Sequence, residues 1–388
     1  MSRTFSKLLR VTLPAVGLSL LAAEGLARLT WDERQGTPGL VLAHPTRVEV
    51  LAPDYDGFFA GQPLRINNLG FRDDEDYQLT KSDETFRILV LGDSVTFGHG
   101  VRFKDTWPYL LRQRLQQWNS DVDWQLWNLG VPGYDMVLSL RTLEELGPEY
   151  DPDLVIVGFY ENDLGAWMFD APSRPPWALH LQSFFKRHSY LYERLRYGYR
   201  ALSYVLLDAA APWQAIQQEW WYLAKPASET QAFDHSNVEF KHRRDTAPVP
   251  PETDRTFEYD SAALATVTRA VRTFQEHHAE NRYRIVFFIN IAPDIDIDSD
   301  ADRFVDGPHN EMNDYFVLLC GQGTPVISSY DAFWAYRPSE VPEAGYHSLA
   351  AANLVKADVL FEYLTPYIIE DPRGLVATPA AVGPHGAF

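Results

Sequence analysis

A serine that could act as a nucleophile follows an apolar run in the first third of the chain. The stretch "ILVLGDSVTFGHGV" covers residues 88–101, and Ser94 closes its Gly-Asp-Ser triplet. At a turn from a strand into a helix, a serine hydroxyl is exposed and the next backbone N–H groups point toward the same place. This arrangement suits both a nucleophile and an oxyanion site. A serine becomes nucleophilic only beside a base, and without one Ser94 could equally be an N-cap.

Three later stretches combine with the first into a recognisable order. They are "NLGVPGY" (128–134), "GFYENDL" (158–164) and "HSLAAAN" (347–353). With "GDSVTFGHG" they resemble the four blocks of the GDSL/SGNH hydrolase superfamily, over about residues 86–164 and 282–364. The resemblance implies a serine esterase with a three-layer α/β/α, flavodoxin-like fold around a five-stranded parallel sheet.

The resemblance also assigns roles to single residues. Ser94 matches the nucleophile and His347 the catalytic histidine. Gly133 matches the glycine whose backbone N–H enters the oxyanion hole, and Asn162 the asparagine whose side-chain amide does the same. Such a site needs no cofactor and no metal. His99, inside the first block, is interpreted as lining the pocket or facing solvent.

The acid of a catalytic triad is missing from its usual place. The family usually has Asp three residues before the histidine, where this chain has Ala344. Three outcomes are open: Glu343 replaces the acid, a backbone carbonyl orients the ring in a Ser–His dyad, or activity is weak or lost. Asp306 stands three residues before His309, but this pair precedes the last predicted strand, whereas the family's pair follows it.

Short apolar runs alternate with helical patterns along the part of the chain that carries these blocks. This alternation favours a parallel sheet covered by helices on both faces. Ligands of such sheets bind beyond the carboxyl ends of the strands, which is where Ser94 falls. The predicted strands are 87–92, 123–130, 153–160, 282–290 and 324–330, and the predicted helices 105–118, 134–146, 261–280 and one starting near 348.

At the N-terminus, basic residues are followed by an uncharged, mostly apolar run. Arg3, Lys7 and Arg10 precede the uncharged run Val11–Ala23, as in a signal peptide or an uncleaved signal anchor. This pattern predicts a membrane-anchored protein whose catalytic domain lies outside the cytoplasm. A buried core helix is the alternative. The expected organisation is 1–30 signal segment, 31–85 linker and lead-in, 86–370 hydrolase domain with a helical insertion at about 165–260, and 371–388 tail.

Composition narrows the class of partner. The 388 residues include 34 basic and 53 acidic ones, a net charge of −19, which argues against a nucleic-acid partner. The expected substrate is a small-molecule, glycan or lipid ester, such as an O-acyl ester of envelope carbohydrate, and the membrane is a partner through the N-terminal segment. A catalytically weak or inactive carbohydrate-binding protein and an O-acyltransferase are the alternative functions.

Overall fold

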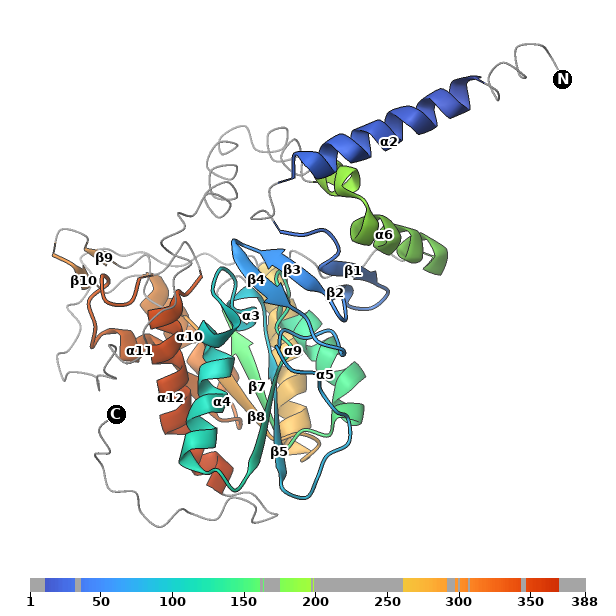
Figure 1. Cartoon of the computed structure of the whole chain (residues 1–388). Helices are drawn as coiled ribbons and strands as arrows, with labels where there is room; N and C mark the ends of the chain where they lie inside the picture. The colour runs from blue at the N-terminus through green and yellow to red at the C-terminus, as the bar shows by residue number, and fades with distance from the viewer. Residues whose placement is uncertain are drawn as a thin grey trace.

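A parallel β-sheet forms the centre of the computed structural model (Figure 1). The structure describes residues 11–31, 36–160, 163, 175–196, 198, 261–291, 297–298, 301–305, 308–342 and 347–369. Its five-stranded sheet has the order β11-β8-β7-β5-β6, with every neighbouring pair parallel. This confirms the predicted five-stranded parallel sheet. The strands are β5 (Thr85–Leu91), β6 (Asp123–Asn128), β7 (Leu154–Phe159), β8 (Ile285–Ile289) and β11 (Val326–Ser328).

Helices cover both faces of this sheet. Every residue of β5, β7 and β8 is buried, as expected of strands packed on both sides. Along β5, Ile88 and Val90 belong to one apolar cluster, and Leu89 and Leu91 belong to another. The first cluster includes residues of α4 (Trp107–Trp118) and α12 (Ala350–Ile369), and the second includes residues of α5 (Met136–Tyr150), α9 (Ser261–Ala279) and α10 (Pro308–Cys320).

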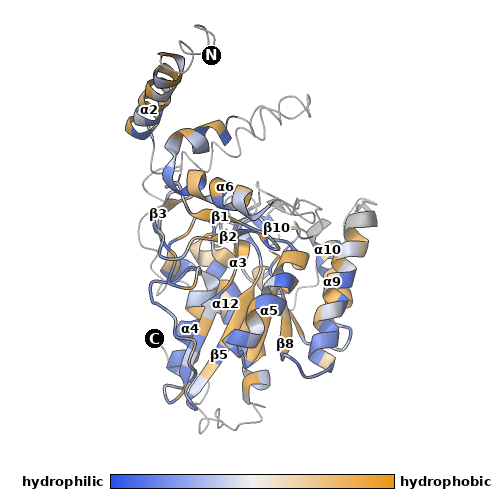
Figure 2. Cartoon of the chain, turned by 90° about the vertical axis from the view of Figure 1, so that its right-hand side faces the viewer, coloured by the Kyte–Doolittle hydropathy of each residue, from blue (hydrophilic) through white to orange (hydrophobic). Residues whose placement is uncertain are grey.

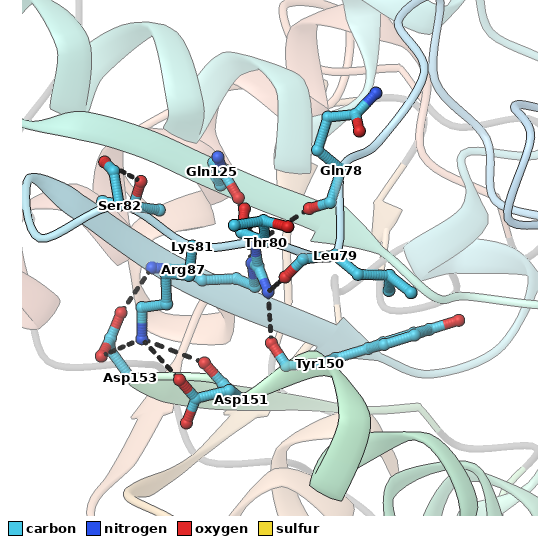
Figure 3. Close-up of polar contacts among 11 residues, drawn as sticks. Gln78, Leu79, Thr80, Lys81, Ser82, Arg87, Gln125, Tyr150, Asp151 and Asp153 are labelled. Carbon is cyan, nitrogen blue, oxygen red and sulfur yellow. Dashed lines mark hydrogen bonds and ion pairs between the residues drawn. The ribbon is translucent and has the colours of Figure 1, made fainter.

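A buried arginine joins the start of the sheet to the segment that precedes it. Arg87 of β5 has no exposed surface. Its guanidinium lies 4.1 Å from the ring centroid of Trp127 and donates to the carbonyls of Gln78, Leu79 and Tyr150 (Figure 3). A buried charge is tolerated only when its hydrogen bonds are satisfied. Because Arg87 needs these carbonyls as acceptors, it holds residues 78–80 against β5.

Two β-hairpins lie in the segment that the sequence analysis describes as linker and lead-in. They pair β1 (Val41–His44) with β2 (Val48–Leu51), and β3 (Asp56–Phe59) with β4 (Gln62–Arg65). A third apolar cluster joins them to α3 (Ser94–Phe97), since it contains Leu51, Ile66 and Phe97. The hairpins therefore pack over the end of the sheet from which Ser94 is presented (Figure 1).

The N-terminal helix α2 (Leu13–Leu29) projects from the body of the protein (Figure 2). Ala27 is its only buried residue, and Leu18 and Leu21 are 67% and 70% exposed. The alternative interpretation of the N-terminal run as a buried core helix is therefore wrong. Within the described ranges, no helix combines the length and the apolarity needed to cross a membrane.

The residues that follow helix α6 (Pro176–His188) hold the C-terminal half of α2 in place. The carboxylate of Glu24 accepts hydrogen bonds from the Ser189 hydroxyl at 2.8 Å and from the Leu191 amide at 3.0 Å. On its other side, Lys186 of α6 pairs with Glu49 of β2 in the first hairpin. Most of the helical insertion predicted at about 165–260 lies outside the described residues.

Candidate active site

The turn that follows β5 presents Ser94. Gly92 has φ +152°, and a Cβ there would lie 2.3 Å from the hydroxyl oxygen of Thr96, so only glycine fits. Asp93 caps α3 by accepting the Val95 amide at 2.9 Å. The N-cap is therefore Asp93 and not Ser94. This leaves the Ser94 hydroxyl available for chemistry at the start of α3, where backbone N–H groups have no partner within the helix.

The second loop is tied directly to the first. The Asn128 side chain donates to the Thr96 carbonyl at 3.0 Å and accepts from the Gly130 amide at 3.0 Å, and the Val131 amide donates to the Gly92 carbonyl at 3.1 Å. These bonds fix the loop that carries Gly133 against the serine turn. Gly133 is exposed and has φ +84°, a conformation that favours glycine.

The third loop places a buried carboxyl behind the site. Asp163 is 2% exposed and accepts the Tyr160 amide at 2.7 Å. Burial, together with the nearby carboxylates of Asp93 and Asp135, raises the pKa of the Asp163 carboxyl well above its usual range. Tyr160 is itself buried in the apolar core. Asn162, the expected oxyanion donor, lies outside the described residues.

The structure brings His347 to Ser94 across 253 positions of sequence. The Nε2 atom of His347 lies 2.8 Å from the Oγ atom of Ser94. The next residue is held firmly: the Ser348 hydroxyl accepts from the buried Lys356, and the Ser348 carbonyl accepts from Asn353 at 3.1 Å. Because His347 immediately precedes the anchored Ser348, the segment at the start of α12 positions the His347 ring beside Ser94.

His99, which the sequence analysis interprets as lining the pocket or facing solvent, is a direct neighbour of His347. Its ring stacks on that of His347, with centroids 4.2 Å apart and an interplanar angle of 22°. Phe59 contacts the same His99 ring edge-to-face at 4.9 Å. In the sequence, the only sign that His99 could contact His347 is its position inside the first block. Nothing in the sequence indicates the contact between Phe59 and His99.

A buried arginine holds the loop that carries His99. Arg72 is 2% exposed and donates to the carbonyls of Phe97, at 2.9 Å, and Val101, at 2.6 Å. Burial lowers the pKa of Arg72 to about 10, so the guanidinium stays charged at neutral pH. Arg72, in the lead-in segment, thus holds the loop of residues 97–101 in place, and this loop contains His99.

We expect His99→Ala to lower kcat, by up to about 100-fold, because the His347 ring loses the surface that fixes its plane. The KM for p-nitrophenyl acetate should change little. His99→Phe should restore most of kcat, because a phenyl ring offers the same stacking face. Steady-state kinetics of the three proteins, with thermal unfolding as the folding control, checks this. Equal loss in both variants would contradict a role in stacking.

The comparisons with known proteins agree with this geometry. The model of the GDSL-like lipase/acylhydrolase family matches residues 90–347, more than half of the chain. The chain belongs to this family. The match runs from β5 to His347, so it contains both Ser94 and His347.

Relatives outside the family model are distant. An arylesterase of Vibrio mimicus is 32% identical over 82 residues, which are 21% of this chain and 40% of that protein. The match thus spans less than half the length of this curated relative. A two-domain esterase active on acetylated mannans, co-crystallised with mannopentaose, has a TM-score of 0.38 and 11% identity, over 77% of this chain and 53% of its own. A GDSL-like lipase of Bacteroides thetaiotaomicron has a TM-score of 0.36 and 9% identity, over 75% of this chain and 93% of its own.

The positions at which an acid was considered lie in a part of the chain that the structure does not describe. Both Glu343 and Ala344 fall outside the described residues, so the three outcomes for the acid stay predictions.

We expect Glu343→Gln to leave kcat nearly unchanged, because a residue four before the histidine need not point the way that one three before it does. We expect Ala344→Asp to raise kcat at neutral pH, because a carboxylate there would orient the imidazole and stabilise its charged form.

The kcat of the two variants and of the parent for p-nitrophenyl acetate at neutral pH tests this. A large loss in Glu343→Gln would instead identify Glu343 as the orienting acid. An unchanged or lower rate in Ala344→Asp would mean that the site is built around the absence of that aspartate.

Proposed function

We propose that this protein is a serine esterase that cleaves acyl esters with Ser94 and His347. The observation that carries the proposal is the distance of 2.8 Å between His347 Nε2 and Ser94 Oγ, within hydrogen-bond reach for proton transfer. The pair lies beyond the carboxyl end of β5, where parallel α/β sheets bind their ligands. Membership of an acylhydrolase family agrees with this chemistry.

Acylation begins when Nε2 of His347 takes the proton of the Ser94 hydroxyl. The Ser94 oxygen attacks the carbonyl carbon of the ester and the carbonyl oxygen gains a negative charge. We expect the backbone amides of Ser94 and Gly133 and the side-chain amide of Asn162 to bind this oxyanion. When the tetrahedral intermediate collapses, the imidazolium gives its proton to the departing alcohol, and an acyl-enzyme remains.

Deacylation repeats these steps with water. His347 takes a proton from a water molecule, the resulting hydroxide attacks the acyl carbon, and Ser94 leaves with the proton returned by His347. A stacked aromatic neighbour such as His99 suits this cycle, because the same ring must face first the serine and then the water. The firm attachment of Ser348 limits how far that ring can move.

The proposed substrates are O-acyl esters of an envelope carbohydrate or lipid. Trapping with a fluorophosphonate tests whether Ser94 is activated, since labelling needs a nucleophilic serine. Labelling at Ser94 with turnover of p-nitrophenyl acetate supports the esterase. An unlabelled, folded protein that binds glycans would instead be a carbohydrate-binding protein that keeps the fold. Acyl transfer to an added sugar, seen in the products, would mark an O-acyltransferase.

We also propose that the N-terminal segment associates with a membrane and leaves the catalytic domain outside the cytoplasm. The three basic residues before the apolar run support this orientation, and so does the exposure of the α2 leucines. We expect protease added to cells with a permeabilised outer layer to digest the catalytic domain. Detergent-lysed cells are the control for its sensitivity. Full protection before lysis would place the domain in the cytoplasm.

A further inference from the structure

A cavity of about 280 Å³ adjoins the proposed catalytic centre. Its walls come from segments outside the five-stranded sheet: residues 36–41 before and in the first hairpin, Phe59 of β3, and Glu193 and Arg196 beyond α6. Trp31, directly after α2, lines it as well. Pro132 and Gly133 contribute from the second loop, so one end of the cavity touches the expected oxyanion site.

Two ring contacts connect the wall of this cavity to His347. Phe59 lines the cavity and packs on His99 at 4.9 Å, and His99 stacks on His347 at 4.2 Å. The cavity therefore borders the catalytic pair through Gly133 on one side and through the Phe59 and His99 rings on another, and Ser94 and His347 are not among its lining residues.

The lining of the cavity is charged as well as aromatic. Glu193 is 5% exposed, and its carboxylate lies 2.8 Å from the Arg196 guanidinium. Glu49, also in the wall, pairs with Lys186. An acyl chain in this space would lie against two ion-paired carboxylates and a guanidinium and offer them no hydrogen bond, which is unfavourable. Sugar hydroxyls would donate to the carboxylates and accept from the guanidinium.

The aromatic residues complete a surface suited to a sugar ring. The Trp31 indole N–H donates to the Gly36 carbonyl at 2.8 Å, and Tyr190 contacts its ring edge-to-face at 5.2 Å. The indole is thereby fixed before any ligand arrives, which lowers the entropic cost of binding. The volume lies just below the range of about 300–1,000 Å³ of typical ligand pockets, so it suits one sugar ring better than a long lipid chain.

We propose that this cavity is the subsite for the pyranose ring that carries the scissile ester. The inference rests on the proposed esterase function and names its substrate class, an O-acylated glycan. Trp31 and Phe59 form the apolar walls against the ring, while Glu193, Arg196 and Glu49 bind its free hydroxyls.

The test compares acetate release from substrates that share a six-membered ring and differ in hydroxyls. The probes are partially O-acetylated manno-, xylo- and cello-oligosaccharides, cyclohexyl acetate, which lacks hydroxyls, and p-nitrophenyl acetate, which needs only the catalytic pair. We expect the wild-type protein to prefer at least one acetylated glycan over cyclohexyl acetate. Trp31→Ala and Glu193→Gln should each lower kcat/KM for that glycan by about tenfold or more, mostly through KM, and leave p-nitrophenyl acetate turnover unchanged.

Two further variants control for folding and for tryptophan loss in general. Trp31→Phe keeps an aromatic wall and should retain most of the glycan activity. Trp177→Ala removes a tryptophan of α6 that is 69% exposed and not part of the cavity, and it should change neither activity. The subsite is overturned if no glycan is preferred over cyclohexyl acetate, or if Trp31→Ala and Trp31→Phe lower both activities equally. Failure of the wild-type protein on p-nitrophenyl acetate would instead overturn the proposed function itself.

Discussion

Ser94→Ala is expected to abolish ester hydrolysis, with a loss in kcat of roughly a million-fold, as removal of a serine nucleophile can cause. Without the hydroxyl no acyl-enzyme can form, and only oxyanion stabilisation and substrate binding remain. The measurement is turnover of p-nitrophenyl acetate together with fluorophosphonate labelling. Both signals should disappear in the variant.

The same substitution should leave the fold intact. The cap of α3 is the Asp93 carboxylate, and α3 therefore keeps its capping bond when the Ser94 oxygen is removed. Alanine is also a better helix former than serine at this first helical position. Thermal unfolding of Ser94→Ala should match that of the parent and of Ser120→Ala, a control at an exposed serine in the turn before β6. Turnover within tenfold of the parent would remove Ser94 from the mechanism.

The sheet was predictable from sequence because its strands are buried on both faces. Such strands appear as continuous apolar runs, and all five predicted runs lie in the observed sheet. Ser94 and His347 were predicted from the blocks that resemble the family, and both lie near the end of a regular element: Ser94 three residues after β5 and His347 three residues before α12. Residues fixed to element ends can be placed once the order of the elements is known.

The surroundings of the site were much harder to predict. The hairpin strands β1 to β4 have only four residues each, too few to show an alternating pattern against the turn formers around them. The contact of Phe59 with His99 joins residues that share no periodicity, and it exists only because the hairpins pack on α3. The same holds for Arg72, whose hydrogen bonds all go to carbonyls that any residue could supply. Tertiary packing, rather than local sequence preference, decides all three.

His347→Ala is expected to lower kcat by about 10⁴-fold or more, nearly as much as loss of the serine itself. The Ser94 hydroxyl would keep its place, because the turn at Gly92 and the cap by Asp93 do not depend on the histidine. It would lose the acceptor for its proton, so both turnover and fluorophosphonate labelling should fall together. KM should change little, because the imidazole acts on the serine and not on the bound ester.

The matched control is His180→Ala, which removes an exposed histidine of α6 and should leave turnover unchanged. A second comparison uses His99, whose ring lies 4.2 Å from that of His347 and is the nearest imidazole the structure shows to the proposed base. If His347→Ala kept substantial activity, and His347→Ala/His99→Ala lost it, His99 would be the base and His347 its support. We expect the single His347 variant to be inactive already, because the 2.8 Å contact with Ser94 Oγ is made by His347. Inactivity of the single variant would support the proposed roles of the two stacked rings: His347, which contacts the serine, transfers the proton, and His99 behind it fixes the plane of the His347 ring.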